Sequence, residues 1–286
     1  MLAASDRTLV LADKRVLGYA EYGAVDGFPV VYAHGGLACR LDVLAGAASA
    51  GECGVRLIAV DRPGIATSDS RPGRSVVQWA EDVTELRDHL GFDDFAAMGW
   101  SMGGQYALAL GFALEPRVRR VAVIAGGLPL TEPGRFEEMP LVDRFYIRLS
   151  QRTPWLARQC LWSMGTVARF APGVYGRLTA RELPSADGAV IRDEGFATFG
   201  RRTAEAMRQP EGHVDDYLAA MQPWGFAPED VDVPVDVWAG ADDVFLNPGW
   251  PAELAHRIPK ATLNTRSGGH FVAHLHWTEI FQALRR

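Results

Sequence analysis

Apolar and polar residues follow one another along this chain with two different periods. Short apolar runs predict buried strands, and longer segments with apolar residues three and four positions apart predict helices between them. The predicted strands are residues 8–12, 16–22, 30–33, 56–60, 95–100, 118–125, 235–239 and 261–266, and the helices between them include 76–90 and 102–114. Because parallel strands need crossover connections, this order predicts an α/β fold whose mostly parallel sheet is flanked by helices, after an opening hairpin.

The helix over residues 76–90 has recognisable start and stop signals. Ser75 is placed to cap the free amides of the first turn, and Gln78, three residues on, is placed to reach back to it. Gly91 adopts a left-handed backbone readily, so it is expected to end the helix.

The strand pattern is interrupted over residues 128–221, a segment rich in arginine, proline and aromatic residues. Helical periodicity is visible there around residues 141–149 and 197–207. We therefore predict a core made of residues 1–127 and 222–286, with residues 128–221 inserted as a helical cap. A chain of 286 residues favours one elaborated core over two independent domains.

Composition narrows the classes of partner. The formal charge of −6 includes no long block of either sign, so neither a nucleic-acid nor a membrane surface is expected. The three cysteines, Cys39, Cys53 and Cys160, have no CxxC spacing, which argues against a disulfide framework, a metal site or a cofactor built on them. The N-terminus lacks an apolar signal core, so a cytoplasmic protein is expected, and a homodimer is left open.

The strongest chemical signal lies at residues 99–103, which read Gly-Trp-Ser-Met-Gly between a predicted strand and a predicted helix. A G-x-S-x-G turn of this kind forces Ser101 into a strained conformation and exposes its hydroxyl, and flanking side chains would clash. Ser101 is therefore the predicted nucleophile. Residues 162–165 repeat Trp-Ser-Met-Gly, but Leu161 replaces the leading glycine, so Ser163 is expected to be an ordinary cap residue.

A serine hydroxyl needs a base, and seven histidines are present. His270 lies on a glycine-rich loop after the strand 261–266 and is the predicted base. His274 and His276 follow on the last helix, where packed or solvated roles are expected.

The acid that orients the base should come after a strand, between the serine and the histidine in the chain. Residues 242 and 243 supply two candidates directly after the strand 235–239. Asp243 is preferred, and Asp242 is the alternative, with a turn-stabilising role if it is not the acid.

Acyl transfer also needs donors for the oxyanion of the tetrahedral intermediate. The amide of Met102 is one candidate, and the second should come from the turn after residue 35, either Gly36 or Leu37. His34 is expected to brace that loop, and Asp61 is expected to anchor the loop after the strand 56–60.

These motifs together resemble the α/β-hydrolase superfamily. The resemblance rests on His-Gly-Gly at 34–36, Asp-Arg-Pro-Gly at 61–64, Gly-Trp-Ser-Met-Gly-Gly at 99–104, the segment 240–243 and Gly-Gly-His at 268–270. It covers nearly the whole chain. It implies an eight-stranded, mostly parallel sheet flanked by helices, with the cap inserted after the sixth strand.

The function expected from this resemblance is hydrolysis of a small to medium hydrophobic ester through an acyl-enzyme on Ser101. An apolar pocket above the serine is expected from the core residues Leu37, Trp100 and Phe271 and from cap aromatics, among them Trp162 and Phe199; the cap also contains Trp155, Phe170, Tyr175, Phe196, Tyr217, Trp224 and Phe226. The same triad would also serve a C–C bond or amide hydrolase. The alternative from another class is a non-catalytic ligand-binding or receptor protein on this fold.

Overall fold

The computed structural model describes residues 2–286 and contains an eight-stranded sheet with the order β1-β2-β4-β3-β5-β6-β7-β8. β1 and β2 pair antiparallel, as do β2 and β4, and every other pair is parallel. The strands are β1 (Leu2–Val10), β2 (Val16–Gly23), β3 (Phe28–Ala33), β4 (Val55–Val60), β5 (Phe95–Trp100), β6 (Val118–Ile124), β7 (Val235–Gly240) and β8 (Ala261–Arg266). The predicted α/β architecture is confirmed.

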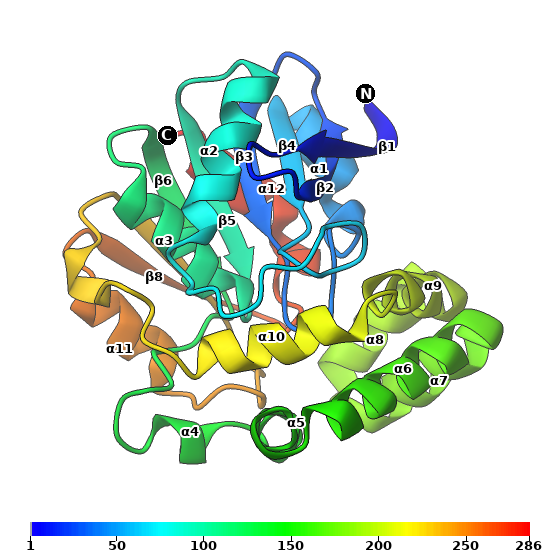
Figure 1. Ribbon diagram of the computed structural model, residues 1–286. Helices are drawn as coiled ribbons and strands as arrows, with labels where there is room; N and C mark the ends of the chain where they lie inside the picture. The colour runs from blue at the N-terminus through cyan, green and yellow to red at the C-terminus, as the bar shows by residue number, and fades with distance from the viewer. Residues whose placement is uncertain (1) are drawn as a thin grey trace.

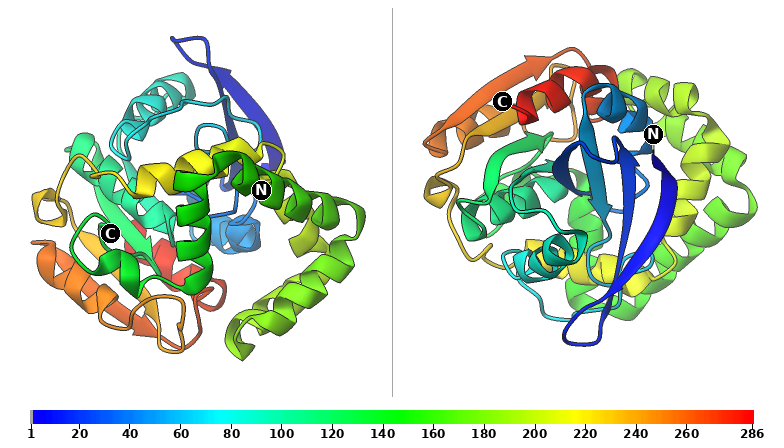
Figure 2. Two further views of the ribbon diagram at one scale, coloured as in Figure 1. Left: turned by 60° about the horizontal axis from the view of Figure 1, so that its bottom comes forward. Right: turned by 90° about the horizontal axis from the view of Figure 1, so that it is seen from above.

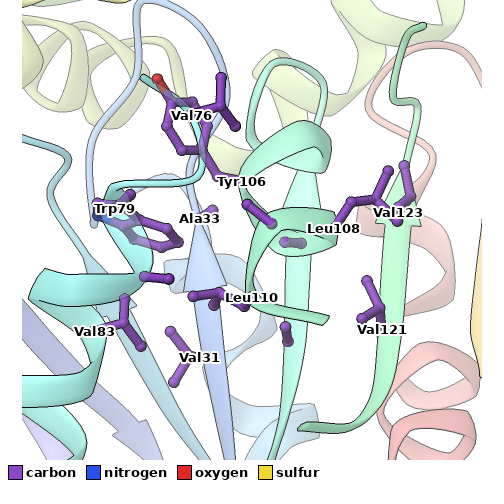
Figure 3. Packing of buried hydrophobic residues seen from close by; sticks show 14 of the residues in the cluster. Val31, Ala33, Val76, Trp79, Val83, Tyr106, Leu108, Leu110, Val121 and Val123 are labelled. Carbon is purple, nitrogen blue, oxygen red and sulfur yellow. The ribbon is translucent and has the colours of Figure 1, made fainter. Parts of the chain in front are cut away.

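Helices cover both faces of the sheet, because side chains of the parallel strands alternate between two apolar clusters. In β3, Val31 and Ala33 join the cluster of α2 and α3, whereas Val30 and Tyr32 join that of α1 and α12. Figure 3 shows the first cluster, in which Trp79 and Tyr106 pack over the strands. The core helices are α1 (Ala47–Glu52), α2 (Trp79–Leu90), α3 (Gly103–Ala113), α11 (Trp250–Arg257) and α12 (Ala273–Leu284), with 3-10 turns η1 (Leu44–Gly46) and η2 (Pro228–Asp230).

The segment between β6 and β7 is helical, as expected. Its helices are α4 (Arg135–Glu138), α5 (Leu141–Arg152), α6 (Pro154–Phe170), α7 (Pro172–Glu182), α8 (Ser185–Glu194), α9 (Phe196–Ala206) and α10 (Pro210–Ala220). They gather at one end of the sheet, and both termini lie at the other end (Figure 1). Seen from below, α5 and α10 stand on one side of this group and α7 and α9 on the other (Figure 2).

Two local predictions need correction. The first strand begins at Leu2 rather than residue 8, because its early part is held by backbone pairing with β2, which an alternating pattern does not reveal. α2 begins at Trp79, and Ser75 does not cap it: Gln78 reaches back and accepts the Ser75 N–H at 2.9 Å, so residues 75–78 form a turn before the helix. Gly91 ends α2 in the left-handed conformation, as predicted.

None of the helices in the described part of the chain combines the length and the apolar character that crossing a membrane requires.

Candidate active site

Ser101 occupies a sharp turn between β5 and α3. Its φ of +52° lies in the left-handed region, which is costly for a residue with a side chain. A Cβ on Gly99 would lie 2.2 Å from the carbonyl oxygen of Gly103, and one on Gly103 would lie 2.1 Å from that of Ala33. The two glycines are therefore required by close backbone approach, and the turn lifts Ser101 out of the carboxyl edge of the sheet.

Ser101, His270 and Asp243 form one hydrogen-bonded row. His270 Nε2 lies 2.9 Å from Ser101 Oγ, and His270 Nδ1 lies 2.9 Å from Asp243 Oδ2. The other oxygen of Asp243 accepts the backbone N–H of Phe245 at 2.8 Å, which fixes the carboxylate. With Nδ1–H donating to Asp243, Nε2 is left to accept the Ser101 proton, which is the arrangement a general base needs.

Asp242, the alternative acid, is not part of the row. It is exposed, and its backbone N–H donates to the carbonyl of Gly268 at 2.9 Å, so it belongs to the turn that supports the histidine loop. The structure thus brings Asp243, and not Asp242, to His270.

Trp100 holds the histidine loop from the nucleophile side. Its indole N–H donates to the carbonyl of His270 at 2.9 Å, and its ring stacks on Phe271 with centroids 5.0 Å apart. A Cβ on Gly35 would lie 2.4 Å from the same indole ring, so Gly35 leaves the space that Trp100 fills. The residue before the nucleophile therefore positions the base.

Asp187, on cap helix α8, supports the same loop from behind. It is fully buried, and its Oδ1 accepts the backbone N–H of Phe271 at 2.8 Å. A Cβ on Gly269 would lie 2.5 Å from Asp187 Oδ2, so Gly269 allows the carboxylate to approach. Burial raises the pKa of Asp187. The cap is thus hydrogen-bonded to the residue next to His270.

The candidate oxyanion donors lie side by side. A Cβ on Gly36 would lie 3.4 Å from Met102 Cε and 3.8 Å from Met102 Cβ, so the Met102 side chain packs against Gly36. Leu37 has a φ of +55°, which turns the loop sharply after Gly36. Within residues 2–286 no acceptor takes the N–H of Gly36, Leu37 or Met102, so all three amides are available to a substrate oxygen.

The loop that carries Gly36 rests on a buried charge network. Arg62 donates to the carbonyls of His34 and Gly35, the second at 3.0 Å, and pairs with Asp216 on cap helix α10 at 2.7 Å. Although burial alone would raise it, Arg62 and Arg74 hold the pKa of Asp216 well below its usual value. The network joins the oxyanion loop to the cap.

His34 and Asp61 have the structural roles that the sequence suggested. His34 Nδ1 lies 2.9 Å from the Gly35 carbonyl, and Nε2 accepts the Arg62 N–H at 3.2 Å, so both ring nitrogens are used in the loop. Asp61 accepts the N–H and the guanidinium of Arg40, at 2.8 and 2.7 Å.

A cavity of about 650 Å³ opens above Ser101, between the sheet edge and the cap. Of the predicted pocket residues, Leu37, Trp100, Phe199 and Phe271 line it. Two further cap aromatics, Tyr175 and Tyr217, line it as well, together with Trp224, which follows α10. The walls are mostly apolar and aromatic, which suits a small hydrophobic ligand.

Trp162 was predicted in the pocket, and this is wrong. The buried face of α6 is formed by Ala157, Leu161, Gly165 and Ala168, at helical spacing. Trp162 is one residue past Leu161, which turns it about 100° away, and it is 57% exposed. Ser163, in the same exposed stretch, donates to the Gln159 carbonyl and has no contact with the triad.

The sequence reasoning missed two carboxylates, Asp143 and Asp187. Asp143 lies on α5 and lines the cavity, and Tyr217 donates its hydroxyl to Asp143 Oδ1 at 3.3 Å. Each acid shares the inward face of its helix with an isoleucine four residues on, Ile147 and Ile191. A charge on an otherwise apolar helix face was the available signal.

The family model described as the alpha/beta hydrolase family matches residues 30–283. The chain belongs to this family. It is 30% identical over 224 residues to the magnesium-chelatase 30 kDa subunit of Rhodobacter capsulatus, covering 76% of this chain and 72% of that protein.

Solved structures of this fold include an esterase from Exiguobacterium antarcticum and an enol-lactonase from Burkholderia xenovorans. The TM-scores are 0.71 and 0.69, at 19% identity and 98% coverage of both chains in each case. Within residues 2–286, no three His, Cys, Asp or Glu side chains lie close enough together to hold a metal ion.

Proposed function

We propose that this protein is a serine hydrolase that cleaves a small to medium hydrophobic ester through an acyl-enzyme on Ser101. The observation that carries the proposal is the row in which Ser101 Oγ, His270 and Asp243 are joined at 2.9 Å beneath an apolar cavity. Family membership supports hydrolysis, and the cavity supports the apolar substrate.

In the first half-reaction, Ser101 Oγ attacks the ester carbonyl as its proton passes to His270 Nε2. Asp243 holds Nδ1–H and stabilises the imidazolium that forms. The amide of Met102, with that of Gly36 or Leu37, donates to the oxyanion. Collapse of the intermediate breaks the C–O bond, and the departing alkoxide takes the proton from His270.

In the second half-reaction, water attacks the acyl-enzyme. His270 Nε2 accepts the water proton and returns it to Ser101 as the acid leaves. The same residues therefore serve both steps, and no further group is needed.

A fluorophosphonate probe with intact-mass readout tests the nucleophile, together with a panel of acyl esters. We expect one adduct on the wild type, none on Ser101→Ala, and a loss of about 10³-fold or more in kcat for that variant, since removing a triad member removes most of the chemical acceleration. Ser163→Ala is the matched control, because it repeats the Trp-Ser-Met-Gly letters on an exposed helix.

The panel also separates the rival functions. Turnover of an amide or a β-diketone that exceeds turnover of every ester would replace the ester assignment with amide or C–C hydrolysis. Absence of both adduct and turnover, with thermal stabilisation by an apolar ligand, would favour a receptor.

A further inference from the structure

Acidic residues outnumber lysine and arginine around the cavity. Its lining carboxylates are Asp42, Asp143 and Glu182, and in the described part of the chain Arg202 is the only lysine or arginine that lines it. Both nitrogens at the end of Arg202 are already paired with Glu194, at 2.5 and 2.7 Å. The positive charge of Arg202 is therefore balanced by Glu194.

His274 adds no positive charge to the cavity at pH 7. Burial, with Arg202 nearby, lowers the pKa of this lining imidazole to about 4, so it is neutral at pH 7. The catalytic row of Ser101, His270 and Asp243 contains no lysine or arginine either.

Asp143 is the carboxylate best placed to meet a substrate. It lines the same cavity as Ser101 and His270, and burial raises its pKa. Its Oδ1 accepts the Tyr217 hydroxyl at 3.3 Å, whereas no described residue donates a hydrogen bond to its Oδ2. No arginine, lysine or histidine in residues 2–286 forms an ion pair with it.

In the core, unlike at Asp143, carboxylates are paired with arginine side chains. Five of them lie within 3.0 Å of an arginine nitrogen: Glu21, Asp61, Asp82, Asp216 and Asp236. Removing a carboxylate from water is costly, and a guanidinium offsets that cost. At Asp143 the compensating cation is missing from the protein, so a bound ligand is the group that would supply it.

The cavity walls favour the same kind of ligand. The aromatic residues Tyr217, Trp224, Trp250 and Phe245 line the cavity with Asp143. Aromatic faces attract ammonium groups through their negative π-surface, and they also bury the hydrocarbon of an ester.

We propose that the substrate of this site is an ester that carries a protonated amine, with Asp143 as the counter-ion of the amine. The inference rests on the proposed function, because the amine is recognised in the same cavity where Ser101 attacks the carbonyl. A carboxylate substrate would be repelled by Asp143, and a purely apolar ester would leave it unpaired.

Two series of aryl and alkyl esters test this. In the first series a chain of constant length on the acyl side ends in methyl, hydroxyl, ammonium or carboxylate. In the second series the same chain is on the alcohol side. In the better series we expect kcat/KM to be about tenfold higher for ammonium than for methyl, because a charged hydrogen bond in a partly buried site has roughly this effect. Carboxylate should be the poorest.

Asp143→Asn keeps an oxygen for the Tyr217 hydroxyl and removes only the charge. We expect it to lower the ammonium-to-methyl ratio of kcat/KM about tenfold, mainly through KM. Asp193→Asn, an exposed change on α8, is the control and should leave the ratio unchanged. The ammonium preference should also weaken as salt is raised.

The outcomes are separable. A hydroxyl ester as good as the ammonium ester, or a ratio that survives in Asp143→Asn, overturns the counter-ion role while leaving ester hydrolysis in place. If no ester of any series is hydrolysed, or if hydrolysis survives in Ser101→Ala, the proposed function itself fails.

Discussion

Buried carboxylates fall into two groups in this molecule, and their surroundings differ. Where the cap meets the core, Asp216 is held between Arg62 and Arg74 and is fully neutralised. Around the cavity and the histidine loop, the buried Asp42 and Asp187 and the half-buried Asp143 form no ion pair with any residue in 2–286. The other fully buried carboxylates, Glu21, Asp61, Asp82 and Asp236, are each paired with an arginine. Unpaired buried charge of this kind is a feature of functional sites.

The largest loss of stability is expected when a paired buried charge is removed, as at Asp216. Asp216→Asn leaves two buried guanidinium groups, those of Arg62 and Arg74, without a counter-ion. Breaking a buried ion pair from one side costs about 3–5 kcal/mol, so we expect a loss of that order in the free energy of unfolding, measured by urea denaturation.

Asp215→Asn is the neighbouring control. Asp215 forms no ion pair with a residue in the described chain, and its change should cost less than about 1 kcal/mol. Equal losses for the two variants would show that the Arg62 network is not a stabilising link between cap and core.

The same chemical change should act in the opposite direction at Asp187. Its charge has no cation to lose, and Asn keeps an oxygen for the Phe271 N–H, so Asp187→Asn should be neutral or stabilising. Asp187→Ala removes the acceptor and should cost about 1–3 kcal/mol, since it leaves a buried N–H unsatisfied. Urea denaturation measures both, and ester kcat shows whether the His270 loop has moved.

Two results would contradict this account of Asp187. If Asn is as destabilising as Ala, the charge is compensated by something other than the hydrogen bond to Phe271. If Ala lowers stability but leaves kcat at the wild-type value, Asp187 supports the cap and does not position the base.

Much of the candidate site could be predicted because its signals are local. The Gly-Trp-Ser-Met-Gly turn needs glycine at 99 and 103 for contacts within a few residues, and the order of serine, acid and histidine follows the strand ends of the sheet. The choice of Asp243 over Asp242 came from the family resemblance, because the family pattern places its acid three residues beyond the glycine, here Gly240. The two Asp187 variants test a contact that is not local, because Asp187 and Phe271 lie far apart in the chain.

What could not be predicted depends on which helix face turns inward and on partners far away in the chain. Trp162 was misplaced because the inward face of α6 is set by packing at Leu161 and Gly165. Asp143 and Asp187 resemble surface acids in the sequence, because nothing local shows that an arginine partner is absent. The only indication in the sequence was that each acid lies on an otherwise apolar helix face.

The effect expected at Asp42 depends on pH. Burial raises the pKa of Asp42 to about 7, from an ordinary value near 3.8. Because this folded-state pKa lies above the unfolded one, the contribution of Asp42 to stability is fully present below about pH 4 and is lost as the pH rises to about 7. Asp216, with its lowered pKa, contributes in the opposite sense: its stabilisation is lost as the pH falls.

Asp42→Asn removes the titration and keeps an acceptor for the Gly35 N–H, which Asp42 Oδ2 accepts at 3.2 Å. The stability of this variant relative to the wild type should therefore rise between pH 4 and pH 7 and then level off. A rise of up to about 4 kcal/mol is expected, since the shift is about three pKa units and one unit corresponds to about 1.4 kcal/mol. Urea denaturation across this range measures it, with Asp193→Asn as the flat control. A difference that falls with pH would mean that Asp42 is stabilised as the anion in the folded state, and it would move Asp42 into the arginine-paired group.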